Sequence, residues 1–173
     1  NDLVFYHLQG ARLGILDLEK FKRQVKYCLL PNGTCTDKVM QVGGRYSDTL
    51  PFDFMGKMGI WFENFSLPAV INECLLQSYN GILRFFPNWP QGRRAEFRTL
   101  RAAGGFLVSA VKEDDEVKWV EITSEKGSKL RFYNPWSCKV QVECSRCIVI
   151  LEGAILEVET YSGELMRLVP LEY

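Results

Sequence analysis

The spacing of apolar residues changes near Tyr79, and this change divides the chain into two parts. Before it, apolar residues recur every three or four positions over 3–8 and again over 16–29, which is the spacing of the buried face of an α-helix. We expect two antiparallel helices there, separated by a break at 10–14. Asp17 precedes the second run and is the expected N-cap, because its carboxylate can accept a hydrogen bond from a free backbone amide of the first turn.

A third helix is predicted just before the change of spacing. Ser66 is its expected cap and Pro68 lies in its first turn, where a missing amide hydrogen costs nothing. Its apolar residues lie between 69 and 76, and it should end by Asn80-Gly81. The second and third helices are joined by residues 31–66, which begin with a helix-stopping Pro-Asn-Gly and show little periodicity. Loops longer than about 15 residues in a compact domain are usually functional or disordered.

After Gly81 the pattern is typical of strands, with short apolar runs separated by turn residues. Apolar and polar residues alternate cleanly over 139–143 and 155–160, as expected of strands with one buried face. Three polar segments are expected as hairpin tips: 113–116, 125–127 and 161–163. The fold class is therefore α+β, with a helical segment at 1–80 that contains the loop 31–66 and an antiparallel β-sandwich domain at 81–173.

Composition narrows the classes of partner. The 173 residues are 47% hydrophobic, and 21 Lys and Arg balance 21 Asp and Glu, so no net field favours nucleic acid or an anionic membrane. No apolar run approaches the roughly 20 residues that a membrane-spanning helix needs. The first residues also lack the basic and apolar regions of a signal peptide, which leads us to expect that Asn1 lies in the interior of a longer polypeptide.

Metal and cofactor sites are not expected. Cys144 and Cys147 have the CxxC spacing, but a structural zinc needs a second pair of ligands and His7 is the only histidine. We expect a turn with free or locally bridged thiols instead. The acidic run 113–116 lacks the spaced oxygen ligands of a calcium loop and is expected to be a solvated turn. His7 lies among apolar neighbours without an evident Ser or Cys partner, which disfavours a nucleophilic enzyme.

Three segments carry a resemblance to a known family: Ile71 to Ser78 (INECLLQS), Gly81 to Pro87 (GILRFFP) and Leu100 to Phe106 (LRAAGGF). Together they resemble the junction between the barrel and the C-terminal β-domain of glycoside hydrolase family 95, the inverting α-L-fucosidases. In the family, the corresponding helix ends in LLQS, the corresponding strand ends in LLPALP, and the sequence continues with LRARGGF. The resemblance implies the last helices of an (α/α)6-type barrel, a carbohydrate partner, and a periplasmic or extracellular location.

Three helices cannot close such a barrel, so the chain is interpreted as a C-terminal piece that is inactive alone. Inverting hydrolysis needs a general acid and a base-activated water, with the two carboxyls about 6.5–9.5 Å apart. In the family the acid lies well upstream, in a segment that this chain does not contain. The apolar faces of the first two helices are expected to be partly exposed, or to be covered by the missing N-terminal part of the parent protein or by another copy of the chain.

The candidate site lies just before the third helix. There the family carries a signature close to Asp-Gly-Asn-Phe-Gly, whose aspartate belongs to the catalytic machinery. Placed by the helix, these positions fall on residues 62–66, so that Asn64 and Phe65 match while Phe62 replaces the aspartate and Glu63 the glycine. Phe62 cannot accept a proton, so either Glu63 has taken the carboxylate role or the site has lost or changed its chemistry.

Glu63 is therefore the catalytic candidate, and Asn64, Trp61 and Phe65 are the candidates for binding substrate. Sugars stack on aromatic faces while carboxylates and amides hold their hydroxyls, and residues 31–66 have this composition. Two plainer interpretations stay open. The aromatic residues could pack in a core, and Glu63 could simply favour the positive end of the helix that follows it.

Two other classes of function remain open. The first is a non-catalytic carbohydrate-binding or structural β-sandwich module, which is distinguished by whether Trp61, Trp89, Trp119 and Trp136 share one exposed face or point into a core. The second is a related barrel enzyme, a glycoside phosphorylase or a glucoamylase-like hydrolase. A phosphorylase would need an anion pocket, for which four arginines are weak candidates because alternation with apolar residues is usual for a solvated strand face: Arg93, Arg94, Arg98 and Arg101.

Overall fold

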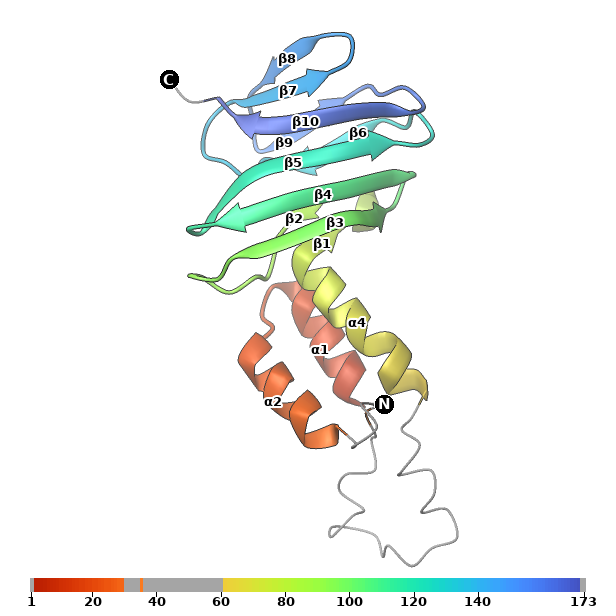
Figure 1. The fold of residues 1–173 in the computed structure, drawn as a ribbon, viewed down its shortest axis with the longest axis vertical. Coiled ribbons are helices and arrows are strands. Elements are labelled where there is room, and N and C mark those ends of the chain that lie inside the picture. Colours follow the sequence, from red (N-terminus) through yellow and green to blue (C-terminus); the bar gives the residue numbers. More distant parts are fainter. Residues whose placement is uncertain (1, 30–34, 36–60, 172–173) are drawn as a thin grey trace, which may run out of the picture. The chain divides into compact units, whose positions relative to one another are not determined.

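The computed structural model describes residues 2–29, 35 and 61–171, and within them the fold is α+β (Figure 1). Three described helices come first, and a six-stranded antiparallel sheet with two small sheets follows. The predicted change from helices to antiparallel strands is confirmed, and no described helix lies between Phe97 and Pro170. The described residues give no evidence of an (α/α)6 barrel. The chain divides into two compact units, Asn1–Glu73 and Cys74–Tyr173.

In the first unit, α1 (Asp2–Leu13) and α2 (Leu18–Cys28) pack through their apolar faces. Ring contacts join the two helices at His7 and Phe21, whose centroids are 4.9 Å apart, and both side chains are buried. Asp17 is the N-cap of α2 as predicted, since its Oδ1 accepts a hydrogen bond from the backbone N of Lys20 at 2.8 Å. None of the described helices is long and apolar enough to cross a membrane.

The predicted break at 10–14 begins too early, because α1 continues through Gly10 to Leu13. Gly10 stays helical, and a Cβ there would make an ordinary van der Waals contact with Leu16, 3.5 Å from its Cα. A glycine inside the helix therefore does not end it. Leu13 and Ile15, at the turn that follows, are 72% and 74% exposed.

The third described helix, α4 (Trp61–Leu75), differs from the prediction at both ends. It begins at Trp61, so Ser66 is inside the helix rather than its cap, and the last residues of the predicted loop 31–66 are helical. Pro68 lies inside α4 at an exposed position, and the carbonyl four residues before it loses its amide partner. The helix ends at Leu75 rather than near Asn80, because the next two residues pair as a strand. Residues 31–34 and 36–60 of the predicted loop lie outside the described residues.

The second unit is built almost entirely of antiparallel strands (Figure 1). The main sheet has the order β3-β4-β5-β10-β7-β8, and the small sheets are β1-β2 and β6-β9. A short 3-10 turn, η1 (Tyr79–Gly81), separates β1 from β2. The strands are β1 (Leu76–Gln77), β2 (Arg84–Phe85), β3 (Ala95–Ala102), β4 (Phe106–Glu113), β5 (Glu116–Ser124), β6 (Leu130–Tyr133), β7 (Val140–Cys144), β8 (Ile148–Leu151), β9 (Ile155–Val158) and β10 (Glu164–Pro170).

One apolar core joins the main sheet to the small sheets. Alternate residues of the long strands point inward, among them Ile122 of β5 and Met166 of β10, both fully buried. Phe132 of β6 lies in the same core, with its ring centroid 6.1 Å from that of Phe85 in β2. A bridge between Leu83 and Phe132 links the two small sheets. The small sheets therefore cover one face of the main sheet.

Two of the three predicted hairpin tips are wrong. Asp114 and Asp115, both at positive φ, do form the two-residue turn between β4 and β5. Residues 125–127 and 161–163 instead carry the chain from one layer to the other, from β5 to β6 and from β9 to β10. Turn residues mark where a strand ends, but the partner of the next strand is decided by which face has apolar surface left to bury.

Candidate functional site

The predicted site residues lie in the first turns of α4. The backbone at Trp61, Glu63, Asn64 and Phe65 is helical, and so is Phe62 at the position of the family aspartate. The structure does not describe their side chains. The catalytic role of Glu63 and the substrate-binding roles of Trp61, Asn64 and Phe65 therefore stay predictions. What the structure describes is the junction that follows them.

The three segments that carry the family resemblance meet at this junction. Leu76 pairs with Phe85 and Gln77 with Arg84, which joins the end of INECLLQS to GILRFFP. The backbone N of Phe86 also donates to the O of Leu75 at 2.7 Å.

A hydrogen bond to Ser78 joins the third segment to the first. The Ser78 Oγ accepts a hydrogen bond from the backbone N of Ala103 at 3.0 Å, in the turn between β3 and β4. The next two residues, Gly104 and Gly105, have φ of +87° and +78°, a region that favours glycine. A Cβ at Gly104 would lie 2.9 Å from the ring of Phe106, so the Gly-Gly of LRAAGGF is required by both conformation and space.

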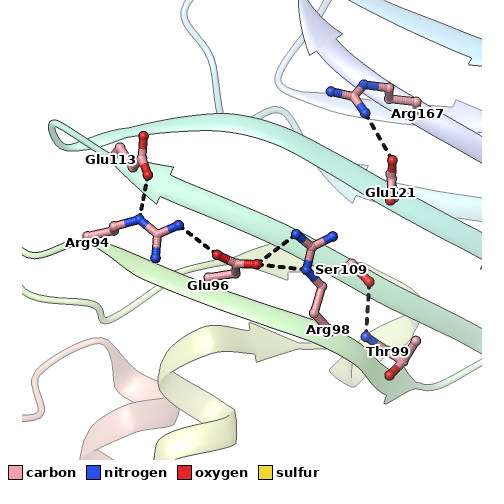
Figure 2. A network of polar contacts seen from close by, with 8 residues as sticks. All are labelled: Arg94, Glu96, Arg98, Thr99, Ser109, Glu113, Glu121 and Arg167. Atoms are coloured by element: carbon pink, nitrogen blue, oxygen red, sulfur yellow. Dashed lines mark hydrogen bonds and ion pairs between the residues drawn. The ribbon is translucent and has the colours of Figure 1, made fainter.

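The arginines considered for an anion pocket are paired with carboxylates (Figure 2). Arg94 donates to Glu113 at 2.5 Å and to Glu96 at 2.7 Å, and Arg98 donates to the other oxygen of Glu96. The hydrogen bond from Arg94, followed by that from Arg98, lowers the pKa of Glu96. Farther across the sheet Arg167 donates to Glu121 at 3.0 Å.

Arg101 is also paired with a carboxylate, because it donates to both carboxylate oxygens of Glu125. Its hydrogen bond lowers the pKa of Glu125, and Lys129 acts in the same way on Glu157. A carboxyl that donates a proton in hydrolysis needs a raised pKa, so Glu96, Glu125 and Glu157 have the wrong environment for a general acid. Arg94, Arg98 and Arg101 are thus engaged in a solvated, charge-balanced sheet surface, which does not favour a phosphate pocket.

The described tryptophans do not line one face. Trp89 and Trp136 pack against the core, and Trp136 Nε1 donates to the backbone O of Val117 at 2.5 Å. Trp119 is half-buried on the sheet, with the guanidinium of Arg98 4.7 Å and that of Arg167 5.3 Å from its ring. The Trp61 side chain lies outside the described residues. This arrangement speaks against a sugar-binding platform built from several tryptophans.

An apolar groove of about 900 Å³ runs along α2 and α4 of the first unit. Phe21, Val25 and Ile71 line it, and the carboxylate of Glu19, which also lines it, is 3.3 Å from Lys22 Nζ. A smaller hollow of about 290 Å³ lies in the second unit at the turn between β7 and β8. It brings Cys144 and Cys147 together with Arg146 and Glu164, a cluster that sequence spacing alone only partly signalled.

Comparisons with known proteins assign no family. No family model matches the chain, and no curated protein matches it. Among solved structures, a GH30 endoxylanase from Clostridium papyrosolvens C71 is similar over 44% of this chain, with 12% identity and a TM-score of 0.32. The chain spans only 23% of the length of that enzyme. This is a weak structural resemblance to part of a glycoside hydrolase; it supports neither the fucosidase family nor the barrel, and it carries no argument about activity.

Proposed function

We propose that the chain is the C-terminal portion of a carbohydrate-active, glycoside hydrolase-like protein related to the α-L-fucosidases. In this proposal residues 1–80 are the last helices of an α/α barrel, and residues 81–173 are an antiparallel β-sandwich domain. The observation that carries the proposal is the meeting of the three resembling segments, through the pairing of β1 with β2 and the hydrogen bond from Ala103 N to Ser78 Oγ. Segments that contact one another in one junction have a physical reason to occur together.

Exposed apolar side chains of the helical unit support the proposal that this unit is part of a larger assembly. Leu13 and Ile15 are more than two-thirds exposed, and Phe5 and Tyr6 of α1 are more than half exposed. Apolar side chains gathered on a surface usually mark an interface. In the proposal this interface belongs to the missing N-terminal part of the parent protein or to another copy of the chain.

The proposed chemistry needs groups from outside this chain. An inverting mechanism uses two carboxyls on opposite sides of the scissile bond, one protonated and one ionised. The three carboxyls of the second unit with lowered pKa, Glu96, Glu125 and Glu157, are each bonded to a cationic side chain. We therefore propose that Glu63 supplies the carboxylate and Asn64 a hydrogen bond to sugar or water, with Trp61 and Phe65 beside them, while the acid comes from upstream.

A structural module without sugar contact is the second candidate. The observation that favours it is the packing of Trp89 and Trp136 against the core, which leaves both residues only partly exposed. In that case the second unit would stabilise its neighbours and take no part in binding.

The test uses the full-length parent, assayed on a panel of aryl α- and β-glycosides. Glu63→Gln keeps the shape of the side chain and removes the base, so turnover should fall by roughly 100-fold or more. Glu116→Gln is the matched control, because Glu116 is an exposed carboxylate in the hairpin of β4 and β5. Unchanged turnover in a folded Glu63→Gln variant, or turnover by the 173-residue chain alone, would overturn the proposed site. A parent that turns over no glycoside would favour the structural module.

A further inference from the structure

The turn between β7 and β8 holds two thiols in contact. The Sγ atoms of Cys144 and Cys147 are 3.2 Å apart, and both cysteines are free. The turn is closed by a hydrogen bond from the backbone N of Cys144 to the O of Cys147 at 3.0 Å. A disulfide has an S–S distance of about 2.05 Å, so the sulfurs need to approach by only about 1 Å. Side-chain rotation within the existing turn can supply that movement.

The surroundings of the pair are built from side chains distant in sequence. Arg146, between the cysteines, donates to both oxygens of Glu164, at 3.0 and 3.2 Å, and its guanidinium lies 3.8 Å from the centre of the Tyr161 ring. Glu164 is buried and also accepts from the backbone N of Tyr161 at 3.0 Å. These contacts fix the arginine beside the thiols, in a hollow of about 290 Å³ that both cysteines line.

This setting makes one thiol the better nucleophile. The hydrogen bond between the two side chains lowers the pKa of Cys144 and raises the pKa of Cys147, which keeps the shared proton. The thiolate, not the thiol, attacks disulfides, and a neighbouring cation favours it. Cys147 is exposed, so a reagent in solvent can reach the pair.

We propose that Cys144 and Cys147 form a thiol–disulfide exchange site that reacts with low-molecular-weight disulfides such as oxidised glutathione. The Cys144 thiolate attacks one sulfur of the small disulfide; a Cys144–S bond forms, the S–S bond breaks, and the leaving thiolate takes a proton from water. Cys147 then releases its proton to water and attacks the Cys144 sulfur, which expels the second small thiolate. Two protein thiols are oxidised to one disulfide while one small disulfide is reduced to two thiols.

A zinc site is the competing use of a CxxC turn. Structural zinc takes four ligands from Cys and His, sometimes with carboxylates. Within the described ranges no group of three or more His, Cys, Asp or Glu could hold a metal, and the nearby carboxylate of Glu164 is committed to Arg146. The geometry thus favours chemistry that two sulfurs can complete by themselves.

The experiment equilibrates the reduced chain with buffers of increasing oxidised-to-reduced glutathione ratio, quenches with acid, alkylates the remaining thiols and maps peptides by mass spectrometry. The expected product is a Cys144–Cys147 linkage that forms at low ratios and is reversed by reduced glutathione. Cys138, a partly exposed thiol outside the turn, is the internal reference and should give at most a glutathione adduct. Ser145→Ala is the matched control within the turn and should leave the linkage unchanged.

Two variants separate the steps. Cys147→Ser should stop at a stable glutathione adduct on Cys144. Cys144→Ser should form its first adduct at least about threefold more slowly than the unsubstituted chain, since it lacks the thiol with the lowered pKa. Arg146→Gln should move the pH profile of Cys144 alkylation to higher pH. The unsubstituted chain alone decides the proposal. Equal modification of Cys138 and the pair without any linkage, or one bound zinc that protects both thiols from alkylation, would overturn it.

Discussion

The core shared by the sheets of the second unit can be tested at Phe132. This side chain is fully buried in β6, yet it belongs to a small sheet of only two strands. Its ring reaches Phe85 of the other small sheet, with the centroids 6.1 Å apart. Phe132→Ala would leave a cavity between the small sheets and the main sheet. Its effect on stability measures whether these layers are packed together.

The expected cost follows from the size of the deleted ring. Truncating a fully buried phenylalanine costs about 3–5 kcal/mol, from lost burial and from the cavity that remains. For a unit of about 100 residues, each kcal/mol lowers the melting temperature by about 4–8 °C, so the loss should be about 12 °C or more. Phe132→Leu retains most of the volume and should cost only about 1 kcal/mol.

Tyr133→Ala is the matched control on the next position of the same strand. Tyr133 is 39% exposed, and its ring lies 4.7 Å from the guanidinium of Arg84, a contact worth about 0.5–1 kcal/mol. The assay is urea unfolding followed by circular dichroism, with the slope of the transition checked for each variant. If Phe132→Ala and Tyr133→Ala differ by less than about 0.5 kcal/mol, the packing of the small sheets against the main sheet is refuted.

Three further measurements test local features. Gly104→Ala should destabilise the second unit by about 2 kcal/mol, and Gly163→Ala by about 1 kcal/mol. Both glycines have positive φ, but only a Cβ at Gly104 would meet an aromatic ring. Urea unfolding of the two variants measures the difference. Asp17→Ala should cost about 1 kcal/mol through the lost cap, seen as faster hydrogen exchange in α2, and unchanged exchange would contradict the cap. Because hydrogen bonds from cations lower the pKa of Glu96 and Glu157, these carboxylates stabilise the fold above the ordinary value of 4.5; this stability should be lost as the pH falls below it. Thermal melts of the chain and of a double variant, with Gln at both positions, between pH 6 and about pH 3 should show a shallower decline for the variant.

The features that were predictable from sequence depend on nearby residues. The cap at Asp17 needs only an amide three positions ahead, and the confirmed change from helices to strands is carried by the spacing of apolar residues. The turn at Asp114-Asp115 follows from two short polar side chains that tolerate positive φ. In each case the interaction closes within a few residues, so its signal is present in a short stretch of sequence.

The features that were not predictable depend on distant partners. The end of α4 at Leu75 is set by the pairing of the next residues with Arg84 and Phe85, a contact that helix-ending signals near Asn80 do not contain. The link between Arg146 and Glu164 spans eighteen positions, so only the CxxC half of that cluster was visible in the sequence. For the predicted site at Glu63, even the start of its helix was misplaced, because the aromatic run from Trp61 looked like a loop of mixed composition.

The contacts at the junction also limit what the family resemblance can say about chemistry. Ser78 and Ala103 are joined by a hydroxyl and a backbone amide, and Gly104 is required by its conformation and by the ring of Phe106. These are requirements of packing, and any protein that makes this junction would face them whatever reaction it performs. The position where the family keeps its aspartate is held by Phe62, where the requirement would be chemical and is not met. A resembling junction therefore carries no conclusion about chemistry, and the proposed activity must be established from the Glu63 substitution in the full-length parent.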